Sequence, residues 1–230
     1  MEHRRCSVVT TYGAVIGRSF LFDLLSELEE VRRVARRAVL DLEVRELVFE
    51  KVRERRLEYI FKHALTRDVA YASILGGRRK ALHRRVADAI ERVLGDKGVA
   101  HQALLAHHRE AAGETEKARA CYLRAASHAA SRYAHEEAER LYRSYLALVD
   151  EPTMESIRAR SDLGSLVLQP QGRMADALAE HEREREEAER IGSKPLVADA
   201  LLHLGTIHGR TGDVAEARAL YERALAIARP

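Results

Sequence analysis

The chain of 230 residues has no tryptophan, two cysteines and four prolines, and aromatic residues make up only 5% of it. Cys6 and Cys121 lie far apart and show no CxxC or metal-ligand spacing, which argues against a disulfide framework and favours a reducing compartment. We therefore expect a cytoplasmic protein. Few prolines, 46% hydrophobic residues and 33% charged residues are typical of long helices that pack through Ala and Leu, so the composition predicts a mainly α protein.

Long apolar segments are also missing. No apolar run reaches the roughly 18 residues that indicate a membrane-spanning helix. The first nine residues, MEHRRCSVV, lack the apolar core of a secretory signal. The sequence therefore predicts a soluble protein without a membrane partner.

A strong excess of one charge is absent too, because the formal net charge is +3. The first hundred residues are mildly basic and the remainder mildly acidic. Neither part approaches the concentrated basic face of a protein that acts on nucleic acid.

The clearest positive signal is a helical repeat at the C-terminal end. Small residues such as Gly205 and Ala217 allow two antiparallel helices to approach closely, and Gly212 permits the turn between them. The segment carries Leu201, Leu204, Gly205, His208, Gly212, Ala217, Tyr221, Ala224 and Pro230. These residues fall at nearly the offsets of the tetratricopeptide pattern of about 34 residues.

Weaker copies of this pattern precede it. One copy comprises Leu163, Gly164, Gly172 and Ala177. Another comprises Leu105, Ala106, Gly113, Ala118, Tyr122 and Ala125, and a helix is expected at about 135–149. The middle copy carries His181 and Glu184 where an aromatic and a small residue are usual, and Pro152 interrupts the regular stacking. Residues 100–230 thus resemble tetratricopeptide-repeat proteins and predict a TPR-like α-α superhelix.

The front of the chain follows a different pattern. Residues 19–28 form a short apolar segment expected to be helical, and residues 31–42 carry a helical apolar stripe. At 47–52 and 57–61 the period changes to two, which predicts a β-hairpin. With helices expected at about 63–75 and 78–94, residues 14–95 read as a winged-helix-like domain with a helical extension, and residues 1–13 as an N-terminal tail.

Five ordered segments carry a family resemblance: Ala14–Phe20, Tyr59–Leu65, Asp68–Tyr71, Arg79–Ala87 and Leu105–His108. Together they resemble the region behind the nucleotide-binding core of large bacterial signal-transduction ATPases of the STAND/AAA type, which are often fused to cyclase, kinase or regulator domains. The resemblance implies a winged-helix domain followed by tetratricopeptide repeats that act as a sensor or docking arm. The sequence contains no Gly-x-x-x-x-Gly-Lys-Ser/Thr loop, so ATP binding is not carried over and no cofactor is expected. Gly76–Lys80 reads as a turn between helices.

Catalytic and metal-binding chemistry is not indicated. His107 and His108 point about 100° apart on a helix, and His101 lies two turns from His108, so no metal site is expected. Cys121 and the serines belong to no nucleophile motif. The Glu-rich segment at 180–189 reads as a solvated helix face held by i+3 and i+4 ion pairs. We expect no catalytic residue and no enzyme activity.

DNA binding is the alternative function. Arginines cluster on the polar side of the helix that precedes the hairpin and on the hairpin turn, where DNA readers place basic residues. They are Arg32, Arg33, Arg36, Arg37, Arg55 and Arg56. Interspersed acidic residues such as Glu29, Glu30 and Asp41 dilute this charge, so contact with another domain of the parent protein is favoured over a transcriptional regulator.

The favoured function is protein docking on the concave face that the first helix of each hairpin would line. The offsets place on it Ala103, His107, Glu110, Ser161, Ser165, Leu168, Asp199, Leu202 and Thr206. The expected partner is a protein, a peptide or another domain of the parent.

The last hairpin carries a second expectation. Its apolar Ala217, Leu220, Tyr221 and Leu225 have no polar capping helix after them. We expect either a fragment cut at this point or a homodimer through this hairpin.

Overall fold

The computed structural model describes residues 2–53, 56–95 and 99–229. It divides into two compact units, the front unit Met1–Ala118 and the rear unit Arg119–Pro230. The sequence placed the boundary at 95–100. The unit boundary lies later because helix α7 packs on α6 of the front unit, so the first expected repeat is divided between the two units.

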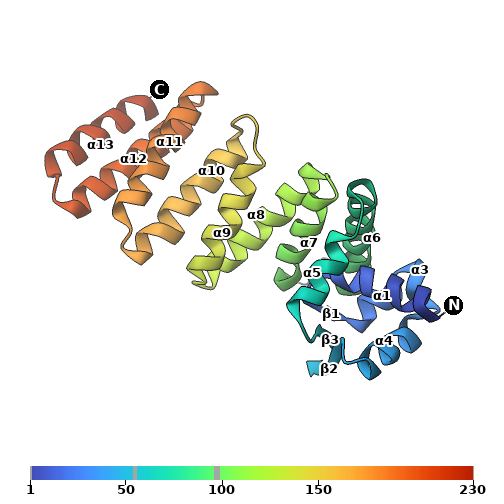
Figure 1. The fold of residues 1–230 in the computed structure, drawn as a ribbon. Helices are drawn as coiled ribbons and strands as arrows, with labels where there is room; N and C mark the ends of the chain where they lie inside the picture. Colours follow the sequence, from blue (N-terminus) through green and yellow to red (C-terminus); the bar gives the residue numbers. More distant parts are fainter. Residues whose placement is uncertain (1, 54–55, 96–98, 230) are drawn as a thin grey trace. The chain divides into compact units, whose positions relative to one another are not determined.

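The front unit combines helices with one small antiparallel sheet (Figure 1). Its elements are α1 (Glu2–Ile16), β1 (Ser19–Leu21), α2 (Phe22–Glu27), α3 (Glu29–Arg32), α4 (Ala35–Val44), β2 (Val48–Arg53), β3 (Arg56–Phe61), α5 (Ala64–Ala72), α6 (Gly76–Leu94) and α7 (Val99–Ala111). The strand order is β1-β3-β2, with both pairs antiparallel.

The predicted hairpin is confirmed as β2 and β3, in which Val48 lies opposite Phe61. A third strand was missed, because residues 19–21 were expected to be helical. Phe20 lies opposite Tyr59, and its ring centroid is 5.9 Å from that of Tyr59 and 5.6 Å from that of Phe61. Burial of these three rings fixes β1 on the sheet, and the helix begins only at Phe22.

The expected tail is wrong for residues 2–13, because they form most of α1. Cys6, Val9 and Tyr12 recur at helical spacing and are all buried. Thr10 supports the helix by donating its hydroxyl to the Cys6 carbonyl at 2.8 Å. These three residues are therefore part of the core of the front unit.

The apolar stripe at 31–42 is confirmed as a core-facing surface, although the chain forms two helices there. Helix α3 ends at Arg32, and α4 begins at Ala35. Val31, Val39 and Leu42 are at most 1% exposed. The stripe holds both helices against the core despite the break between them.

The rear unit is a series of antiparallel helices, and α9 to α13 lie side by side in Figure 1. Its elements are α9 (His135–Ala147), α10 (Met154–Asp162), the π-helical η1 (Leu163–Leu168), the 3-10 turn η2 (Gln169–Gln171), α11 (Met174–Arg190), α12 (Lys194–Thr211) and α13 (Val214–Ala228), and α8 (Thr115–Ser131) crosses the unit boundary. The turn glycines Gly172 and Gly212 have φ of 74° and 94°. Glycine is favoured at such values, as the repeat pattern predicted.

Two equivalent contacts between a glycine and a ring hold the hairpins of the rear unit together. A Cβ on Gly205 would lie 2.7 Å from Tyr221 Cε1, and one on Gly164 would lie 2.6 Å from His181 Nε2. His181 therefore occupies in its repeat the place that Tyr221 occupies in the last one. Around the Gly205–Tyr221 contact, Leu201, Leu204, Leu220 and Ala224 form a buried apolar cluster.

Two further observations bear on the sequence expectations. Cys6 and Cys121 are buried and form no disulfide. Among the residues that the structure describes, no helix combines the length and apolar character needed to cross a bilayer.

Gly164→Ala should destabilise the protein by about 1–3 kcal/mol, because the added methyl group overpacks a site where the His181 ring is fully buried. The matched control is Gly209→Ala, whose methyl group meets only Ala217 at 3.8 Å on an exposed face. It should stabilise by up to about 1 kcal/mol through helix propensity. Urea unfolding of both variants measures the difference, and equal stabilities would contradict close packing of Gly164 against His181.

Candidate functional site

Three residues of the expected docking face lie exposed along α12. Asp199, Leu202 and Thr206 follow one another at helical spacing, and Leu202 is 44% exposed. The Thr206 hydroxyl donates to the Leu202 carbonyl at 2.8 Å and accepts from Tyr221 at 3.3 Å. This strip, the α12 face, offers an apolar side chain between a carboxylate and a hydroxyl.

The serines expected on the same face have partners inside the rear unit. Ser161 on α10 lies 3.3 Å from His203 Nδ1, and Ser165 on η1 lies 3.4 Å from His181 Nε2. Both serines are half-buried. Leu168 is fully buried, so its placement on the docking face is wrong, because the π-helical turn directs it into the core.

The other expected docking residues lie on α7 in the front unit, where His107 and Glu110 are exposed and Ala103 is half-buried. The predicted set is thus divided between the two units. His107 contacts the buried His83 edge to face, with ring centroids 5.8 Å apart.

A buried polar cluster that the sequence interpretation missed lies between α11 and α12. His181 Nδ1 is 2.7 Å and His203 Nδ1 is 3.4 Å from Glu184 Oε2. The His181 and Glu184 side chains are 0% and 1% exposed, whereas that of His203 is 33% exposed. We call these three residues the histidine–glutamate cluster.

The expectation that the segment at 180–189 is a solvated helix face is therefore wrong for its inner side. Glu180 is buried as well, and its oxygens contact Arg143 at 3.4 Å, Arg160 at 2.6 Å and Arg183 at 3.1 Å. Arg160 also forms a pair with Glu187 at 2.7 Å. These ion pairs join α11 to α9 and α10, and the segment's outer side carries the i+3 and i+4 pairs that were expected.

Hydrogen bonds within the cluster shift the pKa values of its members. Burial tends to raise the pKa of Glu184, but the hydrogen bonds from the two histidines outweigh it and the pKa is lowered. The hydrogen bond to Glu184 raises the pKa of His203. Burial raises the pKa of the neighbouring Asp162, which also accepts a hydrogen bond from Tyr142 at 3.4 Å.

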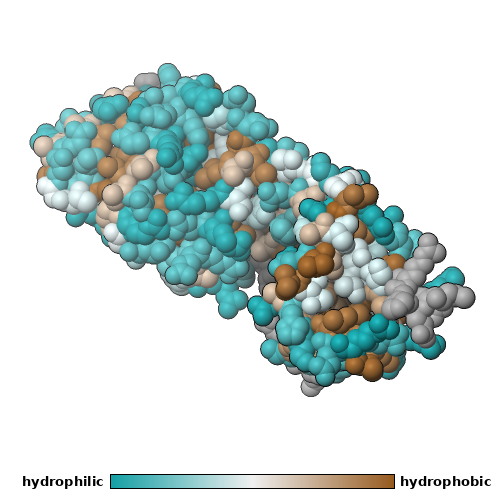
Figure 2. Space-filling view, viewed as in Figure 1, coloured by the Kyte–Doolittle hydropathy of each residue, from teal (hydrophilic) through white to brown (hydrophobic). Residues whose placement is uncertain are grey.

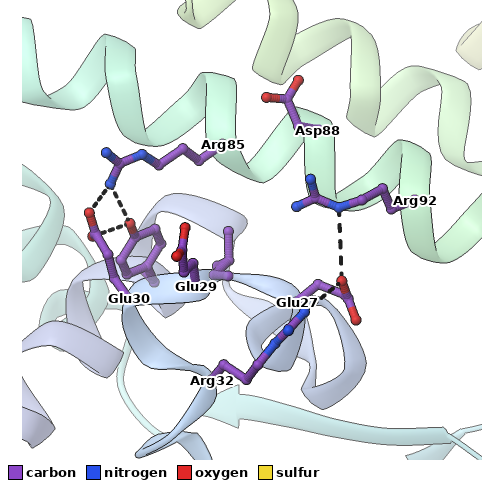
Figure 3. A pocket seen from close by; sticks show the side chains of 9 residues that line it. Glu27, Glu29, Glu30, Arg32, Arg85, Asp88 and Arg92 are labelled. Atoms are coloured by element: carbon purple, nitrogen blue, oxygen red, sulfur yellow. Dashed lines mark hydrogen bonds and ion pairs between the residues drawn. The ribbon is translucent and has the colours of Figure 1, made fainter.

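In the front unit a cleft lies between the α2–α3 segment and α6 (Figure 3). Arg85 extends from α6 toward Glu30 and Tyr12, and its distance to the Tyr12 hydroxyl is 3.1 Å. Burial, followed by the hydrogen bond to Glu30, raises the pKa of Tyr12 to about 12. The charged groups pair with one another across the cleft, so its residues serve to tie α6 to α3.

Except for Arg32, the described arginines expected to bind DNA do not line this cleft. Arg32 lines the cleft and pairs with Glu27 at 3.3 Å. Arg33 is exposed in the turn after α3, and Arg36 and Arg37 are exposed on α4, the helix that precedes the hairpin. Arg56 is exposed at the start of β3, and Arg55 lies outside the described residues.

A second group of histidines is buried where α5, α6 and α7 meet. His83 Nδ1 lies 2.8 Å from His108 Nδ1, and His83 Nε2 lies 2.9 Å from the Tyr71 hydroxyl. Burial, followed by the electrostatic effect of His107, lowers the pKa of His83 to about 4. Burial, followed by the effects of His83 and His107, lowers the pKa of His108 to about 3. Both rings are neutral at pH 7.

Acidification should destabilise the front unit through these histidines. An unfolded histidine titrates near pH 6.5, so between about pH 6.5 and pH 4 the unfolded chain binds protons that the folded pair does not bind. Arg67, Arg79 and His107 face the same rings and oppose their protonation. Amide exchange of α6 and α7 in the full chain should show lower protection at pH 5 than at pH 7, after correction for intrinsic rates.

The control for this effect is His83→Gln, which removes one titrating ring and should weaken the pH dependence. His128→Gln changes a histidine of the rear unit and should leave it unchanged. Equal protection of α6 at both pH values in the unmodified protein would contradict the assignment.

The last hairpin presents part of the apolar surface expected there. Tyr221 and Leu225 are 40% and 53% exposed, whereas Ala217 and Leu220 are buried within the hairpin. Figure 2 shows hydrophobic side chains scattered among hydrophilic ones on the visible face of the repeats. The exposed part of the expected dimer surface is therefore smaller than the sequence indicated.

Comparison with known proteins identifies the repeats. Residues 155–229 match the tetratricopeptide repeat family. A solved structure of kinesin-light-chain TPR-like repeats from Podosopora anserina is 19% identical, with a TM-score of 0.37, and the alignment covers 66% of this chain and 86% of that one. BtubC (BKLC) from P. vanneervenii is 16% identical, with a TM-score of 0.42, and the alignment covers 99% and 91%. No curated protein matches the chain. The family match identifies α10 to α13 as tetratricopeptide repeats, a fold that serves as a scaffold for protein–protein interactions.

Proposed function

We propose that the chain is a non-enzymatic docking module, in which the tetratricopeptide repeats bind a protein, a peptide or another domain of the parent protein. The observation that carries the proposal is the exposed α12 face within the matched region. Asp199, Leu202 and Thr206 are accessible there, although the neighbouring Leu201 and Leu204 are fully buried. An exposed apolar side chain between polar groups is suited to a partner segment that packs and hydrogen-bonds.

The parent context rests on the sequence resemblance. We propose that the front unit is a winged-helix-like domain and that the chain comes from a cytoplasmic signal-transduction ATPase of the bacterial kind, without its ATPase core. Two observations support the winged-helix assignment: the arginine-bearing α4 precedes the hairpin, and β1 closes a three-stranded sheet in the order β1-β3-β2. The two unpaired cysteines support a reducing compartment.

Docking on the α12 face predicts that Leu202→Asp weakens partner binding by about tenfold or more, because a carboxylate would replace the apolar contact. Affinity capture from the native cytosol, with competing DNA present, should recover a protein partner whose affinity is then measured for each variant. Met154→Asp is the matched control, since Met154 is 53% exposed at the start of α10 and a carboxylate is favourable there.

Two outcomes would contradict the docking proposal. One is equal binding of the partner by the Leu202→Asp variant and the unmodified chain. The other is capture that disappears with competing DNA, which would favour a transcriptional regulator acting through the arginines of α4.

A further inference from the structure

The histidine–glutamate cluster contains more polar groups than the packing of the hairpins requires. In the last repeat the same positions are Tyr221 and Ala224, which pack without any buried charge. In the middle repeat they are His181 and Glu184, and the adjacent helix adds His203. Burying a carboxylate costs folding free energy unless its partners compensate. The middle repeat is therefore expected to be less stable than the last repeat.

We propose that His181, Glu184 and His203 bind a divalent transition-metal ion, with zinc as the preferred probe. Their ligand atoms, one from each residue, all lie within 4.8 Å of one another. Two imidazole nitrogens and one carboxylate oxygen form a ligand set that zinc uses in proteins. This inference is independent of the identity of the docking partner.

The spacing of the donors fits a small ion. In a tetrahedral zinc site, bond lengths near 2.0–2.1 Å place the ligand atoms about 3.4 Å apart. Glu184 Oε2 lies 2.7 Å from His181 Nδ1 and 3.4 Å from His203 Nδ1. A shift of the carboxylate by less than about 1 Å brings the first distance into this range.

The surroundings orient the ligands as in a metal site. While His181 Nδ1 faces Glu184, its Nε2 lies 3.4 Å from both Ser165 Oγ and Gln169 Nε2. A metal-bound histidine holds its second nitrogen against a polar group in this way. Gly164 provides the space for the ring, and it belongs to the π-helical η1, a distortion often found at functional sites.

Charge and access also favour a cation. The described hydrogen-bond partners of Glu184 are histidines, whereas Glu180, one turn earlier, is neutralised by arginines. Asp162 lies close enough for its charge to act on His203. The partial exposure of His203 gives an ion a route to the buried pair, and Ser161 Oγ, 3.3 Å from His203 Nδ1, is placed to contribute a further oxygen.

The test measures zinc bound by the untagged, chelator-treated chain of 230 residues in equilibrium dialysis. The matched variant is His181→Tyr/Glu184→Ala, which copies the Tyr221 and Ala224 pair of the last repeat and removes two ligands without opening a cavity. We expect it to bind one zinc fewer per chain and to lose the rise in melting temperature that zinc produces in the unmodified protein. Cobalt(II) should give visible absorption bands of a tetrahedral site only in the unmodified protein.

A second, milder variant tests the proposal even if the double variant fails to fold. His203→Gln changes the half-exposed ligand and should weaken zinc binding by at least about tenfold, whereas His128→Gln, outside the cluster, should leave it unchanged. Equal zinc binding by the unmodified chain and the His203→Gln variant would overturn the proposal. So would a zinc-induced rise in melting temperature that persists in the double variant.

Discussion

The rear unit depends on the close approach of a glycine on one helix to a ring on the next. Gly205 with Tyr221 and Gly164 with His181 are the same contact in successive repeats, and each leaves no space for a methyl group. This approach lets Leu204 and Leu220 meet in the apolar core. Leu202 lies on the side of α12 that this packing leaves accessible to a partner.

The same constraint explains why the repeats were predictable from the sequence and the polar cluster was not. A glycine at a fixed offset from an aromatic residue has few alternatives, so the hairpins could be located from spacing alone. Glu184 lies in a helix rich in Glu and Arg, where a solvated face is the simplest interpretation. Its position in the repeat could have indicated burial: Glu184 follows His181 by three residues, as the buried Ala224 follows Tyr221 in the last repeat.

The front unit shows the limit of local patterns in a different way. The alternation in Tyr59 and Phe61 was sufficient to predict the hairpin, since one face of it is buried. The strand β1 is three residues long, and it exists because Phe20 meets the rings of β3, which are distant in sequence. The position of α1 in the core likewise depends on packing against α4, α5 and α6, which no window of neighbouring residues contains.

Polar groups are buried in both units, but they are compensated differently. In the front unit His83 and His108 remain neutral and bond to each other, so burial costs no unpaired charge. In the rear unit the Glu184 carboxylate is buried against His181 and His203, and neither of these partners brings the permanent positive charge of an arginine. The two front rings bond to each other, whereas the rear cluster brings two imidazoles and one carboxylate within 4.8 Å of one another, a ligand set that zinc uses. This difference is why the metal-binding inference attaches to the repeat cluster and not to the histidines of the front unit.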